Sequence, residues 1–109
     1  MVTPEMVSEL SQGKRPSFMF VCEGKIQHWK ADEQKNGMIV ATTREAANTM
    51  AADLTARTGK TVSVAELGTV PGQTLGNEIA RSISSQGATG VFVTEDGKEN
   101  YFFNAVPKD

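Results

Sequence analysis

The sequence predicts a single α+β domain over residues 1–109, built as two layers, with one mostly antiparallel sheet and the helices chiefly on one face. Three observations predict this class. The chain has 109 residues, the size of a domain with one hydrophobic core. Short apolar segments separated by turn residues alternate with amphipathic helical patterns. Hairpin signals flank the helices and favour antiparallel pairing. The expected order is therefore α-β-β-β-α-β-α-β-β.

The N-terminal residues predict a short helix. Thr3-Pro4-Glu5 places a hydroxyl cap, a proline and an acid where helices begin. Met6, Val7 and Leu10 form a narrow apolar stripe, and Gly13 ends the helix. A helix this short depends on packing against the rest of the domain.

A hairpin and a third strand follow. Residues 18–22 are apolar, residues 25–30 alternate, and Glu23-Gly24 between them is typical of a two-residue turn. The register set by this turn places Val21 opposite Ile26 and continues to Phe18 opposite Trp29. Residues 31–37 are polar and predict a loop. Residues 38–41 predict a short strand.

Two longer helices complete the pattern. Thr42 and Glu45 have the spacing of a capping box, and the apolar face that follows predicts a helix ending at Gly59. Residues 61–67 predict a strand. A further helix is expected from Thr74 to Gln86, and residues 90–94 and 100–104 form a hairpin around the turn at residues 95–98.

Several strands are apolar on both faces, whereas a sheet covered on one side alternates apolar with polar residues. The N-terminal helix and a loop could form a second layer, a second copy of the chain could dock there, or an unprotected edge could aggregate. In the last hairpin we expect Val91 and Val93 to share one face of the sheet with Phe102. The opposite, uncovered face then offers four aromatic anchors for a partner, namely Trp29, Phe92, Tyr101 and Phe103.

Candidate catalytic chemistry is sparse. The single cysteine, Cys22, and the single histidine, His28, lie in one hairpin, but the expected register puts them on opposite faces. We therefore predict no catalytic residue. Zinc sites need three or four Cys, His or carboxylate ligands, and the acids here are scattered. No metal and no cofactor are predicted.

The segment most like a ligand site is the turn Gly68–Thr74, between a strand and a helix start. Gly72, Gln73 and Thr74 could hold an anion on backbone amides at the helix N-terminus. The segment differs from a phosphate-binding loop, because its glycines are one residue too close and Gln73 stands where that loop has lysine. A turn and a helix cap explain the same residues.

The formal net charge is −2, which disfavours a nucleic-acid partner. One cysteine and an N-terminus unlike a signal peptide favour the cytoplasm, and no apolar run is long enough for a membrane span. We expect a small non-catalytic binding or accessory module that forms homo-oligomers or binds a protein partner. The alternative is an enzyme or sensor for an anionic small molecule at the Gly68–Thr74 turn.

Overall fold

The helices and strands begin and end close to the expected positions in the computed structural model, which describes residues 1–104. In chain order they are α1 (Pro4–Ser11), β1 (Ser17–Cys22), β2 (Lys25–Ile26), β3 (His28–Asp32), β4 (Lys35–Ala41), α2 (Arg44–Thr58), β5 (Ser63–Leu67), α3 (Leu75–Gln86), β6 (Gly90–Thr94) and β7 (Asn100–Asn104). The predicted α+β class and the order of elements are confirmed.

Each helix starts at a threonine whose hydroxyl accepts a hydrogen bond from a backbone amide in the first turn. Thr3 caps α1 and Thr74 caps α3, as expected. The cap of α2 is Thr43, which accepts from the Ala46 amide at 3.1 Å, so the capping box predicted at Thr42 is wrong by one residue. Thr42 lies between β4 and α2, and its amide donates to the carbonyl of Thr94 at the end of β6.

The sheet has seven strands and is mixed. All its pairings are antiparallel except that of β4 with β6. β2, β3, β5 and β7 each pair with one strand only, whereas β1, β4 and β6 each pair with two or more strands. The crossover that joins β4 to β6 includes α2, β5 and α3, long enough for a parallel connection.

The sheet divides at Gln27. Its amide donates to the carbonyl of Phe20 in β1 at 2.7 Å, and its carbonyl accepts from the amide of Ile39 in β4 at 3.4 Å. The chain thus changes neighbour at this residue, pairing with β1 before it and with β4 after it. The register Val21–Ile26 is confirmed, but Trp29 pairs with Gly37 and not with Phe18.

Residues 31–37, predicted as a loop, are mostly strand. β3 and β4 form a hairpin whose turn is held by Asp32, which accepts from the amides of Gln34 and Lys35 at 2.7 and 2.9 Å. The polar composition of this segment reflects exposure, because β3 is exposed from Trp29 to Asp32. Polarity alone does not distinguish a solvated hairpin from a loop.

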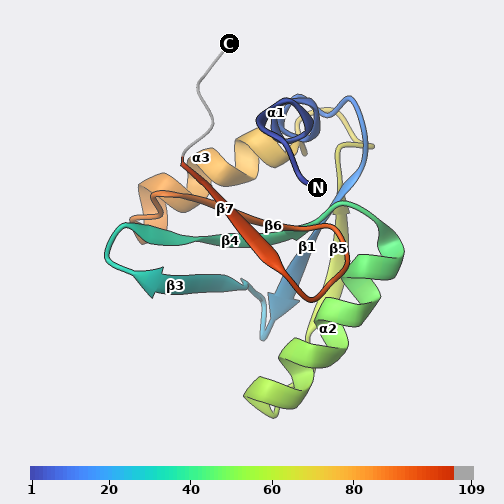
Figure 1. Ribbon diagram of the computed structural model, residues 1–109, viewed down its shortest axis with the longest axis vertical. Coiled ribbons are helices and arrows are strands. Elements are labelled where there is room, and N and C mark those ends of the chain that lie inside the picture. Colours follow the sequence, from blue (N-terminus) through green and yellow to red (C-terminus); the bar gives the residue numbers. More distant parts are fainter. Residues whose placement is uncertain (105–109) are drawn as a thin grey trace.

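The helices lie on both faces of the sheet (Figure 1). α1 and α3 cover one face, over a core that includes Met38, Val40, Val91 and Val93. α2 packs on the other face against the alternate side chains of the same strands, among them Ile39 and Phe20. Two of the three helices therefore share one face of the sheet. The third helix, α2, covers apolar side chains on the other face, which explains why several strands are apolar on both faces.

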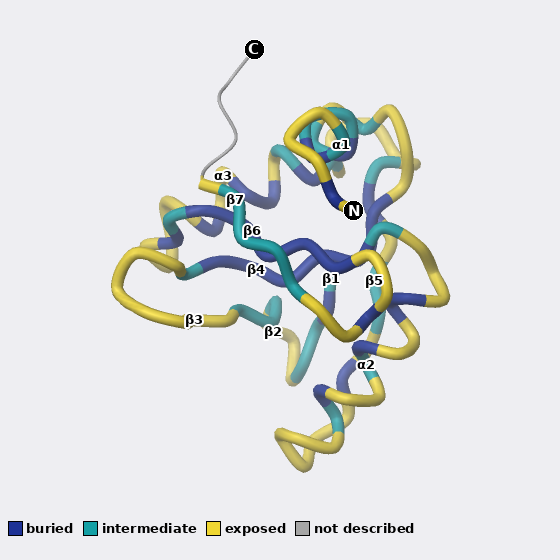
Figure 2. The backbone as a smooth tube through the Cα atoms, viewed as in Figure 1, coloured by how far each residue is buried: buried dark blue, intermediate teal, exposed yellow. Residues whose placement is uncertain are grey.

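α2 covers only part of its face. It packs mainly on β1, β4 and β5, and Figure 1 shows β3 at the left of the view, away from α2 at the lower right. Figure 2 shows that β3 is exposed along most of its length. The part of this face formed by β3, β6 and β7 is left without a helix. Within residues 1–104, no helix combines the length and apolar character needed to cross a membrane.

Candidate functional site

Three aromatic side chains lie in a row on the part of the sheet face that α2 leaves uncovered. The ring centroids of Trp29 and Phe92 are 5.8 Å apart, and those of Phe92 and Phe102 are 5.0 Å apart in an edge-to-face arrangement. Trp29 is 37% exposed, Phe102 is half-buried, and Phe92 between them is 6% exposed. We call these three residues the open sheet patch.

Two paired glycines lie beside this row. Gly37 and Gly90 are opposite each other in β4 and β6, and Trp29 is opposite Gly37. A Cβ at Gly90 would lie 2.7 Å from the tip of the Phe102 ring. The Phe102 ring therefore lies close to the backbone of β6, where a side chain at residue 90 would collide with it.

The four predicted anchors are not brought together. Phe92 is opposite Phe102, Val93 is opposite Tyr101, and Val91 is opposite Phe103. Tyr101 and Phe103 therefore share the face of Val91 and Val93, where they pack against the core beneath α1 and α3. Trp29 and Phe92 lie on the opposite face, within the patch.

The expected pairing in this hairpin is wrong because the turn has five residues, Glu95–Glu99. Asp96 accepts from the amides of Lys98 and Glu99 at 2.7 and 2.9 Å, which extends the turn by one residue. One residue of shift exchanges the faces of a strand. For this reason the sequence pattern does not place Phe102 in the patch. An Asx turn at Asp96 is the sequence feature that indicates the longer turn.

Several polar groups of the Gly68–Thr74 turn are bonded within the turn or to α3. The Gly68 amide donates to the Gln73 carbonyl at 2.8 Å, and the Asn77 side chain donates to the Gly72 carbonyl at 2.7 Å. A Cβ on Gly76, in the first turn of α3, would lie 2.8 Å from the carbonyl oxygen of Ser11. The C-terminal end of α1 therefore lies at the α3 N-terminus, and its carbonyl dipoles oppose an anion there.

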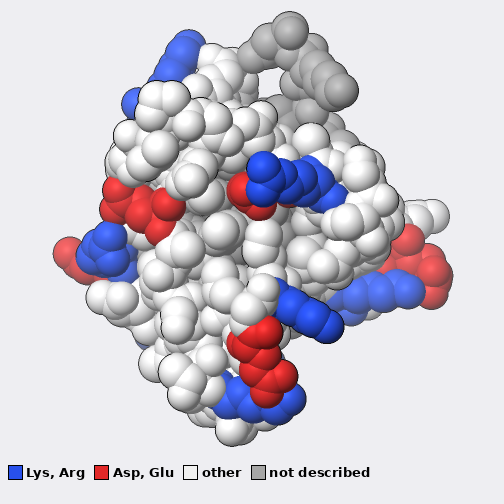
Figure 3. Space-filling view, turned by 180° about the vertical axis from the view of Figure 1, so that it is seen from behind, with Lys and Arg blue, Asp and Glu red and all other residues white. Residues whose placement is uncertain are grey.

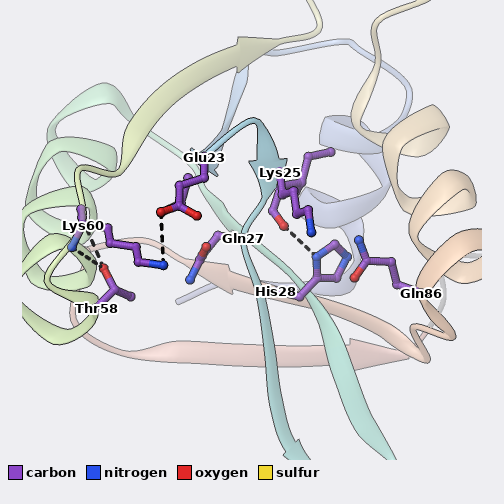
Figure 4. A pocket seen from close by; sticks show the side chains of 9 residues that line it. Glu23, Lys25, Gln27, His28, Thr58, Lys60 and Gln86 are labelled. Carbon is purple, nitrogen blue, oxygen red and sulfur yellow. Dashed lines mark hydrogen bonds and ion pairs between the residues drawn. The ribbon is translucent and has the colours of Figure 1, made fainter.

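A cleft of about 380 Å³ lies at the end of β1 and β2, between the C-terminal ends of α2 and α3. Lys60 pairs with Glu23 at 3.1 Å on one wall, and Figure 4 shows Lys25, His28 and Gln86 on the other, with Gln27 between them. Helix C-termini disfavour anions and the lysines disfavour cations. The cleft therefore favours neither sign of ligand.

His28 is held at both ring nitrogens. Nδ1 is 3.0 Å from the carbonyl oxygen of Ile26, and Nε2 is hydrogen-bonded to the hydroxyl of Ser82 in α3. A carbonyl only accepts, so Nδ1 carries a proton and donates to Ile26, while the Ser82 hydroxyl is the partner of Nε2. Cys22 also lines the cleft, but it packs on the opposite side against the core beneath α2. The sequence contains no motif that relates His28 to Ser82.

On the face shown in Figure 3, basic and acidic side chains lie beside each other. Among the described residues, Lys60 pairs with Glu23 and Arg81 pairs with Glu78. Within the described residues, no group of three or more His, Cys, Asp or Glu side chains is arranged to hold a metal.

The fold and the patch together define a small α+β domain with helices on both faces of a mixed sheet and an aromatic row on the part of one face that α2 leaves uncovered. Comparison of the chain with protein-family models, with curated proteins and with solved structures found no match.

Proposed function

We propose that this domain is a non-catalytic binding module that works by self-association, with the open sheet patch and the adjoining strand β7 as its contact surface. One observation carries the proposal: an aromatic row on an uncovered sheet face reaches the edge strand. Exposed aromatic residues are enriched in the centres of protein interfaces. A single cysteine also suits a reducing, cytoplasmic environment.

A second copy fits this surface better than a nucleic acid does. The β7 sequence, NYFFN, carries no charge, so two copies can approach there without repulsion between like charges. The net charge of −2 per chain adds little long-range repulsion. A nucleic acid bound through stacking would need basic residues beside the rings. β7 provides none, and Lys30, next to Trp29 in β3, is paired with Glu33 at 3.2 Å.

The test is the mass of the protein in solution over a wide range of concentration. Wild-type protein should show a concentration-dependent dimer by light scattering. Phe102→Lys should weaken association by at least about tenfold, because a charge would be desolvated at the contact. Val70→Lys is the matched control: Val70 is 50% exposed and lies outside the patch, so this variant should associate like wild type. A wild-type protein that stays monomeric at every concentration contradicts the proposal.

A further inference from the structure

The edge strands of the sheet differ in protection: β3 carries Lys30 and Asp32, and its register with β4 shifts between them. An edge strand presents unpaired backbone N–H and C=O groups, and natural proteins protect such edges with charges, proline or bulges. The β5 edge carries Glu66, whose carboxylate pairs with Arg44 at 2.8 Å. The β7 edge has no charge and no proline, and its five residues pair with β6 without a register shift. β7 is therefore a regular template for another strand.

We propose that two copies of this chain pair antiparallel through β7, with Phe102 of each copy opposite Phe102 of the other, so that one continuous sheet runs through the dimer. This inference rests on the proposed self-association and specifies its geometry. The occupant of the β7 edge is a second copy because the strand is complementary to itself. Its ends are asparagines and its middle is aromatic.

Symmetry restricts the possible pairings. Two copies of the same edge can pair antiparallel only about a two-fold axis perpendicular to the sheet. This axis keeps the open sheet patches of both copies on the same face of the joint sheet. Phe102 then meets Phe102 at the seam, and the row of Trp29, Phe92 and Phe102 continues into the second copy as six rings.

The register follows from overlap. With Phe102 at the centre, Asn100 is opposite Asn104 of the second copy and Tyr101 is opposite its Phe103, so every residue of β7 is paired. A shift in either direction leaves residues of β7 unpaired. Five residues span about 17 Å, which makes a small interface. Small interfaces form transient complexes, so the dimer should depend on concentration.

The experiment is a cross-linking test of the register that leaves Phe102 intact. Asn100→Cys and Asn104→Cys are made separately in a Cys22→Ser background, which removes the native thiol. Directly opposed residues of an antiparallel pair have Cα atoms at a distance that a disulfide can bridge. On oxidation of an equimolar mixture, the disulfide that joins the two different variants should form several-fold faster than the disulfide that joins two copies of the same variant.

Other outcomes separate this inference from the proposed function. If wild type associates but Trp29→Cys, in the same background, cross-links to itself while the 100–104 mixture does not, the copies meet face to face. Self-association then stands and the β7 pairing is overturned. If wild type is monomeric, the proposed function itself fails.

A measurement on wild-type protein covers the case in which the cysteine variants do not fold. Hydrogen exchange of the β7 amides is compared at low and high protein concentration. The amides that point away from β6 should become several-fold more protected as the dimer forms. Unchanged protection in β7 while light scattering shows a dimer overturns the inference.

Discussion

At the scale of single residues, hydrogen bonds fix the positions of polar side chains that the sequence pattern leaves undefined. His28 connects β3 to α3 through Ser82, which is 3% exposed. Asp96 organises the β6–β7 turn by accepting two backbone amides. Each contact joins segments whose relative position decides which side chains share a face.

The His28–Ser82 contact should stabilise the fold. Ser82→Ala, His28→Ala and the double variant form a double-mutant cycle, and urea unfolding should give a coupling free energy of about 1 kcal/mol. Ser85→Ala is the control, because its exposed hydroxyl donates to the carbonyl of Arg81 within the same helix. A coupling near zero would show that the two side chains act independently.

The pKa of the Asp96 carboxyl is lowered, chiefly because it accepts from the Glu99 amide and then from that of Lys98. A lowered pKa in the folded state stabilises the fold above the unfolded pKa, and this contribution is lost as pH falls through the folded pKa. Asp96→Asn keeps an acceptor oxygen but does not titrate. We expect wild type to exceed this variant in stability above pH ~5 and the difference to shrink in more acidic solution. A constant difference in thermal midpoint across this range would contradict the assignment.

At the scale of elements, turns and caps tie the helices to the sheet. Gly97, in the β6–β7 turn, has a φ of 81°. A Cβ there would lie 2.6 Å from the carbonyl oxygen of Ala46 and 2.7 Å from Cβ of Thr49, both in α2. The turn therefore rests on the first turns of α2, and glycine is needed for its conformation and for its close approach.

A matched pair of glycine variants separates these two requirements. Gly24, in the β1–β2 turn, has a φ of 77° but open space around it. Gly24→Ala should lower the free energy of unfolding by about 1 kcal/mol, the cost of a left-handed backbone. Gly97→Ala should lower it by about 3 kcal/mol, because overpacking adds to that cost. Equal losses in chemical unfolding would show that the contact with α2 is unimportant.

At the scale of the whole molecule, two features produce the open surface. The sheet divides at Gln27, and the three helices are distributed over its two faces. The chain leaves β1 at Gln27 and crosses to β4, so β3 lies away from α2. α1 and α3 cover the opposite face completely enough to bury Val91 and Val93. The aromatic row is consequently left at the β7 end, where the self-association proposed above would occur.

Local features were predictable from the residues nearby. The caps at Thr3 and Thr74, the ends at Gly59 and Gly87, and the Glu23-Gly24 turn depend on side chains and backbone conformations a few residues apart. The Val21–Ile26 register follows directly from that turn. The pairing of Phe92 with Phe102 was not predictable from alternation alone, since one extra turn residue reverses the faces.

The sequence by itself determined the α+β class, the order of the elements and the aromatic character of the C-terminal hairpin, because periodicity and turn chemistry act over short distances. Only the tertiary structure decided which face each strand presents, that α2 packs opposite α1 and α3, and that Trp29, Phe92 and Phe102 meet. These outcomes depend on contacts between residues far apart in the chain. Alternative strand pairings differ little in local free energy, so the packing of the whole domain decides between them.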